Sequence, residues 1–352
     1  MLKKNFKHTF RRQHKSAGFT LIELLVAVAM GWIVISALLY FVVQLSRTEQ
    51  QELAMSETQR DMSVAVDYIG SDLKDAVFVY DGQCLITGQT AQGEQCPGLI
   101  GRITSFPDND DDKRPILAFW KLETVPYVNN PEPAQQLPGL QSNGDCQGVA
   151  ANRQTECKNL QISRSSYTLV IYFLRKTPSS GGVWDGPAQI TRYALRQYDP
   201  DELSTLKLQD PNFTPPSTGG YKIWPCATAS CSPAPAQTTF RAANEDVLVD
   251  LVDDPQAGKT PTCRLEGEQA TLYKDLRYQP SYPEADLDKI TSFYACVSPW
   301  KAGQGQEVKL YLRGNAFKRA GASGYNNTGF LPTVQAQVKT RSTFDRQPTS
   351  LY

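Results

Sequence analysis

One acidic side chain lies in an otherwise apolar run, and its position could support a specific ion pair. Residues 19–43 read FTLIELLVAVAMGWIVISALLYFVV, in which Glu23 is the single charged residue. A charge at depth in a bilayer is unfavourable by about 2.5–3.5 kcal/mol on insertion scales, so this carboxylate requires a partner. If the chain is cut after Gly18, the new α-amino group of Phe19 on a neighbouring copy can pair with it. Glu23 also lies in the first turn of the expected helix, where the helix dipole favours negative charge.

The apolar run is long enough to cross a membrane. As a helix, its 25 residues rise roughly 37 Å, against a hydrocarbon core of about 30 Å. Residues 1–18 hold six basic residues and no acidic one, which predicts a cytoplasmic N-terminus and an outward-facing remainder. A cleaved secretory signal would have a shorter apolar region. A simple signal anchor would explain the length of the apolar run and the basic residues before it, but it would not explain the carboxylate of Glu23 within the run.

The order of a short basic leader, the residues Gly18-Phe19-Thr20-Leu21-Ile22-Glu23 and an apolar helix resembles the class III signal of type IV pilins and type II secretion pseudopilins. The resemblance implies cleavage after Gly18 by a prepilin peptidase, N-methylation of Phe19, and assembly through the apolar helices with Glu23 setting register. Major pilins usually carry a proline where this chain has Tyr40. That departure favours a minor pilin or a pseudopilin.

Composition limits the chemistry available to the chain. Its two histidines, His8 and His14, both lie in the leader, so a mature chain would lack histidine-dependent catalysis and histidine zinc sites. An enzyme would need a pair of carboxylates, and we expect neither enzymatic activity nor a cofactor. Without the leader, 30 basic residues face 36 acidic ones, which gives no support to nucleic-acid binding. A chain of 352 residues that is 40% hydrophobic can bury a sizeable core.

Eight cysteines follow the apolar run, on the side expected to face an oxidising compartment. An even number there predicts disulfides, and the absence of a CxxC motif argues against a zinc site. Short loops close with the least entropy loss, so sequential pairing is favoured among the 105 possible connectivities. The expected pairs are Cys84 with Cys96, Cys146 with Cys157, Cys226 with Cys231, and Cys263 with Cys296.

The pattern after Val43 changes to that of an amphipathic helix over residues 44–76. Apolar residues recur there at spacings of three and four, which places them on one face of a helix. They are Met62, Val66, Ile69 and Leu73, and the same spacing continues to Val77. No proline interrupts residues 19–74, so we expect one continuous helix. A membrane helix followed by a separate soluble helix is the alternative.

From residue 77 to the end, short segments rich in β-branched and aromatic residues alternate with Gly, Pro and Asp clusters. No helical stripes alternate with them, which predicts an α+β fold: a long N-terminal helix packed on a mainly antiparallel sheet, as in type IV pilins. The last two strongly patterned segments should form a hairpin, and 333–340 is a further candidate strand. The expected strands are 77–80, 98–106, 115–123, 167–176, 188–198, 245–252, 291–298 and 307–315.

Two long polar segments, 125–157 and 209–239, are expected to be insertions closed by disulfides, and to be either binding loops or solvated decoration. Residues 108–112 place carboxylates at alternate positions, as in a calcium loop, but Lys113 and Phe119 occupy positions that an EF-hand gives to Gly and Glu. An acidic solvated turn is the alternative. The Ala257-Gly258-Lys259-Thr260 segment resembles the end of a phosphate-binding loop, but the first glycine of that motif would fall at Asp253.

The order of the elements resembles PilW-type minor pilins and the J-type pseudopilin of type II secretion, with a branch serving cyanobacterial export of hormogonium polysaccharide as one option. The resemblance implies a single-pass inner-membrane protein with a periplasmic head, later part of a surface pilus or a periplasm-spanning pseudopilus. It implies prepilin peptidase, other pilins or pseudopilins, the inner-membrane assembly platform and the lipid bilayer as partners. A low-copy subunit near the filament tip that primes assembly is the main hypothesis. The alternative is a tip adhesin or a subunit that recruits an exported substrate.

Overall fold

The structure is a computed structural model that describes most of the chain. The chain divides into two compact units, residues 1–52 and residues 53–352, and each is described by itself. We refer to residues 53–352 as the head. The described residues are 18, 20–82, 84–85, 98–99, 102–104, 106, 112–138, 146, 148–177, 183–216, 220–221, 224, 238–263, 279–282, 284–301, 303–321 and 330–341.

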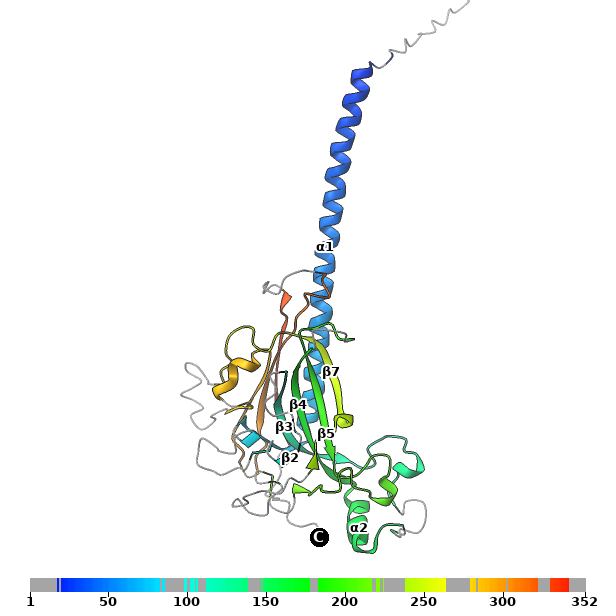
Figure 1. Cartoon of the computed structure of the whole chain (residues 1–352), viewed down its shortest axis with the longest axis vertical. Helices are drawn as coiled ribbons and strands as arrows, with labels where there is room; N and C mark the ends of the chain where they lie inside the picture. The colour runs from blue at the N-terminus through cyan, green and yellow to red at the C-terminus, as the bar shows by residue number, and fades with distance from the viewer. Residues whose placement is uncertain are drawn as a thin grey trace, which may run out of the picture. The chain divides into compact units, whose positions relative to one another are not determined.

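A single helix, α1 (Leu21–Lys74), contributes to both units (Figure 1). The absence of proline permits this continuity, and the alternative of two separate helices is wrong. The helix ends two residues earlier than the sequence pattern predicted. Val77, which extended the predicted helical stripe, lies instead in strand β1 (Ala76–Val79).

The last part of α1 packs into the head through the predicted stripe. Met62, Val66, Ile69 and Leu73 are almost completely buried, and burying each such side chain stabilises the fold by about 1.5–3 kcal/mol. The helix also approaches the sheet closely at Gly314. A Cβ atom there would lie 2.9 Å from both Thr58 Cγ2 and Met62 Cγ, so only glycine permits this approach.

A five-stranded antiparallel sheet forms the centre of the head, with strand order β1-β3-β4-β5-β7 (Figure 1). Its long strands match the predicted segments closely, because each carries a run of β-branched and aromatic residues. The strands after β1 are β3 (Lys113–Thr124), β4 (Ser165–Lys176), β5 (Ala188–Arg196) and β7 (Glu245–Val252).

A four-stranded antiparallel sheet follows in the chain, with strand order β11-β10-β9-β8. The predicted hairpin is confirmed, because β9 pairs with β10 in antiparallel register. In β10, Val308, Leu310 and Leu312 are buried and alternate with half-buried residues, so the strand presents one face to the core. The strands are β8 (Gln279–Pro280), β9 (Phe293–Val297), β10 (Glu307–Arg313) and β11 (Thr333–Lys339).

One apolar cluster joins α1 to both sheets. It combines Ile69 of α1 with Phe119 and Val170 of the five-stranded sheet and Phe293 and Leu310 of the four-stranded sheet, among others. The fold is therefore α+β, as predicted: a long apolar N-terminal helix packed on antiparallel sheets.

A second apolar cluster covers the opposite face of the five-stranded sheet. Phe213, Tyr221 and Trp224, from the segment expected to be a polar insertion, are buried there beside Trp120. The Tyr80 hydroxyl donates a 2.7 Å hydrogen bond to the Tyr221 carbonyl. These three aromatic residues of 209–239 therefore belong to the core, whereas Pro211 and Asn212 of the same segment are exposed.

Two further expectations for the head require correction. The predicted strand 98–106 is reduced, within its described residues, to β2 (Ile103–Thr104), which pairs in parallel with β6 (Thr238–Thr239). The predicted loop 125–157 runs into an unpredicted helix, α2 (Gln154–Ser163), whose N-terminal part lies inside it. Only Cys157 and Leu160 of α2 are buried, so the sequence has no periodic apolar stripe that would indicate a helix.

Short 3-10 helices complete the described structure. They are η3 (Pro133–Gln135), η4 (Ala151–Arg153), η5 (Leu203–Thr205), η7 (Ala242–Asn244) and η8 (Glu284–Ile290). The first three lie near α2, where Val125, Leu137, Leu160 and Tyr198 form a third, smaller apolar cluster.

Candidate processing and assembly site

Thr20 and Glu23 together begin α1. The Thr20 backbone amide donates a 3.0 Å hydrogen bond to Glu23 Oε2, and the Glu23 amide donates a 3.3 Å bond to Thr20 Oγ1. This reciprocal arrangement is a capping box, in which two backbone amides that the helix leaves unpaired are satisfied by side chains. The helix therefore has a defined start at Leu21, whose preceding residue, Thr20, accepts the first helical bond from Leu24 at 3.2 Å.

Gly18, the described residue before this cap, is open to its surroundings. Gly18 and Thr20 are exposed, and a Cβ atom built on Gly18 would meet nothing within 4 Å. Phe19, at which cleavage and methylation are expected, lies outside the described residues. Gly18 itself is therefore accessible to an enzyme.

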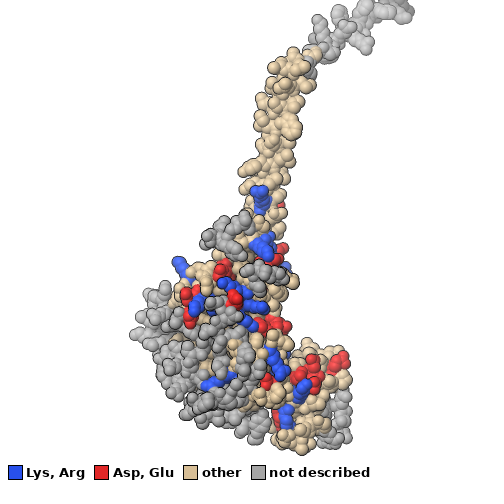
Figure 2. All heavy atoms as spheres, in the orientation of Figure 1, with Lys and Arg blue, Asp and Glu red and all other residues tan. Residues whose placement is uncertain are grey.

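The first half of α1 presents apolar side chains on all sides. Leu21, Trp32 and Tyr40 are 83%, 68% and 73% exposed, and no side chain of the apolar window is buried within the described chain. Figure 2 shows an uncharged surface along this part of the helix. A helix that is apolar all round is unfavourable in water and requires lipid or other apolar helices around it. Among the described residues, α1 is the helix long and apolar enough to cross a membrane.

The other end of α1 is attached to the five-stranded sheet by a buried ion cluster, which we call the Asp72 cluster. It comprises Asp72, Lys121, Tyr172 and Arg192. Asp72 accepts hydrogen bonds from Lys121 Nζ at 2.8 Å, Tyr172 Oη at 2.7 Å and Arg192 Nε at 2.7 Å. One carboxylate therefore joins the helix to β3, β4 and β5.

Burial and ion pairing act in opposite directions on the Asp72 carboxyl. Burial raises its pKa. The positive charges of Arg192 and Lys121 and their hydrogen bonds lower the pKa by a larger amount, so the net pKa lies below the usual value of 3.8. Burial and the adjacent carboxylate raise the pKa of the Tyr172 hydroxyl. The cluster consequently holds a carboxylate, two cations and a neutral phenol at neutral pH.

The sequence did not indicate the Asp72 cluster. Its members lie far apart in the chain, and Asp72 and Arg192 are separated by 120 residues. The available signal was the presence of Lys121 and Arg192 inside segments that otherwise read as buried strands. Buried cations require a partner, which would have indicated an acidic residue on the packed face of the helix.

The structure describes two disulfides, Cys146–Cys157 and Cys263–Cys296, both of which are among the pairings that the sequence predicted. Cys84 is disulfide-bonded as well. Its expected partner Cys96, and Cys226 and Cys231, lie outside the described residues. So do residues 108–111 of the acidic loop, whereas Asp112 lies in a turn. Among the described residues, no group of three or more His, Cys, Asp or Glu side chains could hold a metal ion.

Comparison with known proteins places the N-terminal segment in a defined class. Residues 13–39 match the family model of the prokaryotic N-terminal methylation motif. No curated protein and no solved structure matches the chain. The match covers Gly18, Phe19, the capping box and the beginning of the apolar helix.

The motif supports a type IV pilin-like protein. It implies processing by prepilin peptidase and assembly with other pilins. With the apolar helix that follows, it fits a membrane-anchored, single-pass pilin. Together these properties support a processed subunit of the pilin or pseudopilin type.

Proposed function

We propose that this protein is a minor pilin or pseudopilin that enters a filament at low copy, near the tip, and primes its assembly. The observation that carries the proposal is the methylation motif leading directly into a capped helix whose apolar first half is exposed. In this proposal prepilin peptidase removes residues 1–18 and methylates the new N-terminal Phe19. The apolar half of α1 then leaves the bilayer and packs among the helices of neighbouring subunits.

Glu23 has a different partner before and after assembly in this proposal. In the single chain its carboxylate accepts hydrogen bonds from the Thr20 backbone amide and hydroxyl, at 3.0 and 3.2 Å. In the filament it pairs with the α-amino group of Phe19 on a neighbouring subunit. A buried charge pair of this kind fixes axial register, because misaligned copies leave both charges unpaired.

The size of the head supports a low-copy position. A head that starts at Leu53 and runs to residue 352 is hard to repeat around a densely packed shaft. A subunit at the tip has no neighbour above it and meets no such limit. A tip position also suits a priming role, because the first subunit of a filament contacts other subunits only through its lower surface.

The test measures processing and position separately. Intact mass and N-terminal sequence of the membrane protein, with and without the peptidase, should show methylated Phe19 as first residue only when the peptidase is present. Quantitative mass spectrometry of purified filaments should find far fewer copies than of the main subunit. A full-length chain that keeps its leader would refute processing, and finding this chain as the main filament mass would refute the low-copy position.

The alternative of a head that adheres or recruits substrate cannot be tested by deleting residues 209–239. That deletion would remove Phe213, Tyr221 and Trp224 from the second apolar cluster, and the head would lose stability along with any binding. Point substitutions of exposed side chains are required instead.

A further inference from the structure

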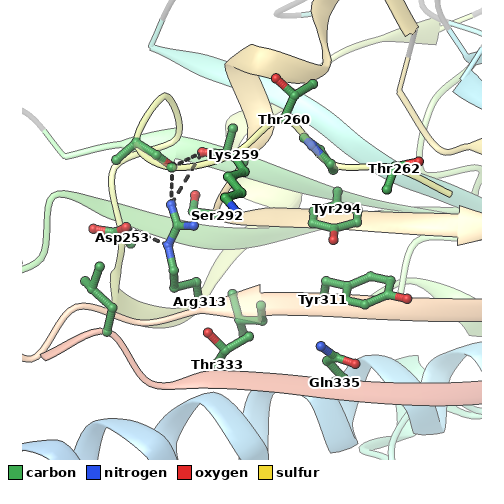
Figure 3. A pocket seen from close by; sticks show the side chains of 16 residues that line it. Asp253, Lys259, Thr260, Thr262, Ser292, Tyr294, Tyr311, Arg313, Thr333 and Gln335 are labelled. Carbon is green, nitrogen blue, oxygen red and sulfur yellow. Dashed lines mark hydrogen bonds and ion pairs between the residues drawn. The ribbon is translucent and has the colours of Figure 1, made fainter. Parts of the chain in front are cut away.

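The outer face of the four-stranded sheet carries a pocket of about 680 Å³ that the filament role does not use (Figure 3). Side chains of β9, β10 and β11 form its floor, and the loop 253–263 forms its wall. This volume lies within the range of about 300–1,000 Å³ that is typical of small-molecule sites. The pocket lies wholly within the head.

The loop that forms the wall is fixed to the sheet at both ends. At one end, Asp253 Oδ2 accepts a 2.7 Å hydrogen bond from Arg313 Nε, and Thr291 donates from its amide to the Pro255 carbonyl at 2.7 Å. At the other end, Cys263 is bonded to Cys296 of β9. A wall attached in this way is preformed, so a ligand need not order it.

Gly258 allows the loop to cover the Arg313 guanidinium. Its φ is +97°, and a Cβ atom there would lie 2.5 Å from Arg313 Nη1. The guanidinium also donates a hydrogen bond to the Ala257 carbonyl, so its contacts are made with the loop. Arg313 and Asp253 form an ion pair and neutralise each other, so the net charge of the pocket is set by its other residues.

The floor of the pocket is aromatic. Tyr294 and Tyr311 are directly paired across β9 and β10, with ring centroids 4.6 Å apart and planes inclined by 11°. Gln335 is paired with Tyr311 on the other side, in β11, so that one row crosses three strands (Figure 3). Both rings are only half-buried, and they offer apolar surface next to polar groups.

Polar side chains also line the pocket, beside apolar ones such as Leu331, and one of them is an uncompensated cation. Lys259 is exposed, has no acidic partner among the described residues, and extends from the loop towards the sheet (Figure 3). Thr260, Thr333 and Gln335 add neutral donors and acceptors. Ser292 is completely buried at the pocket wall, and its hydroxyl makes no hydrogen bond within the described structure.

We propose that this pocket binds an acidic saccharide. A sugar ring has an apolar C–H face that packs on an electron-rich aromatic ring, and its hydroxyl groups suit the exposed threonine and glutamine side chains. Lys259 selects a ring that carries a carboxylate, because a charged hydrogen bond is roughly twice as strong as a neutral one. This inference is independent of processing and filament assembly.

The experiment titrates the full chain in detergent micelles with methyl glucuronide, methyl glucoside and benzoate, followed by ligand-detected NMR. The glucuronide should bind more tightly than either of the other probes, and its binding should weaken with added salt. Failure of the glucuronide to bind would overturn the proposal. Equal binding of the glucoside would overturn the role of the charge, and equal binding of benzoate would overturn the saccharide assignment.

Matched variants locate the binding. Lys259→Gln should weaken glucuronide binding about tenfold and remove the preference over the glucoside. Lys339→Gln, on the same sheet outside the pocket lining, should not. Tyr311→Phe should bind as the wild type does, whereas Tyr311→Leu should lose most binding with an unchanged thermal midpoint. Unchanged binding by both Lys259→Gln and Tyr311→Leu would show that the sugar binds elsewhere.

Discussion

The Thr20 hydroxyl accepts a 3.3 Å hydrogen bond from the Glu23 amide, while the Glu23 carboxylate accepts one from the Thr20 amide at 3.0 Å. Glu23 thus acts within its own chain, in addition to the role that we propose for it between chains. Both roles depend on the carboxylate oxygens, but only the second depends on their charge. The two roles can therefore be separated by substitution.

Glu23→Gln should keep the helix start and lose filament incorporation. Glutamine serves in a capping box as glutamate does, but it cannot form an ion pair with an amine. Glu23→Ala should lose both functions, and hydrogen exchange of the Thr20 amide should accelerate roughly 2- to 30-fold in micelles, as expected for loss of a cap. Incorporation is measured in sheared filaments. Wild-type incorporation of Glu23→Gln would show that the charge is not required.

Asp72→Asn should destabilise the head strongly. The substitution preserves shape but leaves Lys121 and Arg192 buried without a negative charge, and breaking a buried pair in this way costs about 3–5 kcal/mol. Urea unfolding of the full chain, followed by tryptophan fluorescence, measures the loss. Asp67→Asn changes an exposed carboxylate on the same helix and should alter stability by less than about 0.5 kcal/mol. Equal midpoints for the two variants would refute the role of the Asp72 cluster.

The stabilising effect of Asp72 should depend on pH in one direction. Its folded-state pKa lies below the usual 3.8, because Arg192 and Lys121 outweigh the effect of burial. Unfolding therefore takes up a proton in acid, and the stabilisation is complete above about pH 4 and declines as pH falls towards the folded-state pKa. The difference between wild type and Asp72→Asn should be constant from pH 5 to 7 and shrink below pH 4.

Comparing the wild type with Asp72→Asn separates the effect of the Asp72 carboxyl on stability from the effects of other carboxyls. Glu123, beside Arg196, and Glu156, beside Arg153, also have lowered pKa values, although burial acts on both in the opposite direction. Both remain in the wild type and in Asp72→Asn, so their contributions cancel in the difference. A difference that shrinks between pH 7 and 5 instead would assign the effect to another group.

Features set by local pattern could be predicted from the sequence. The alternation in β10 and the stripe of α1 each bury one face of one element, which a few neighbouring residues reveal. The motif around Gly18 and Glu23 is similarly local. Hydrogen bonding between Thr20 and Glu23 could have been predicted as well, since a threonine three residues before a glutamate at a helix start is the signature of a capping box.

Features that depend on distant residues could not be predicted in the same way. Phe213, Tyr221 and Trp224 are isolated aromatics among polar residues, and only the tertiary fold places them on the five-stranded sheet. The pocket requires the loop 253–263 to cross β9 and β10, and Tyr294 and Tyr311 meet only through strand register. Neither relationship leaves a periodic signal in the sequence.

Removing Cys263–Cys296 should destabilise the head more than removing Cys146–Cys157. The two bonds close segments with sequence separations of 33 and 11 residues. In the chain-entropy account, the longer loop restricts the unfolded chain more, by about 1 kcal/mol at 25 °C. Urea midpoints of the double serine variants Cys263→Ser/Cys296→Ser and Cys146→Ser/Cys157→Ser measure this difference.

The same pair of variants distinguishes a local effect from a global one. Loss of Cys263–Cys296 frees one end of the loop 253–263, so it should also weaken glucuronide binding, whereas loss of Cys146–Cys157 should leave binding unchanged. Arg313 still attaches the other end of the loop through Asp253, so the pocket should be loosened and not abolished. Equal binding by the two variants would show that the disulfide at Cys263 stabilises the head without shaping the pocket.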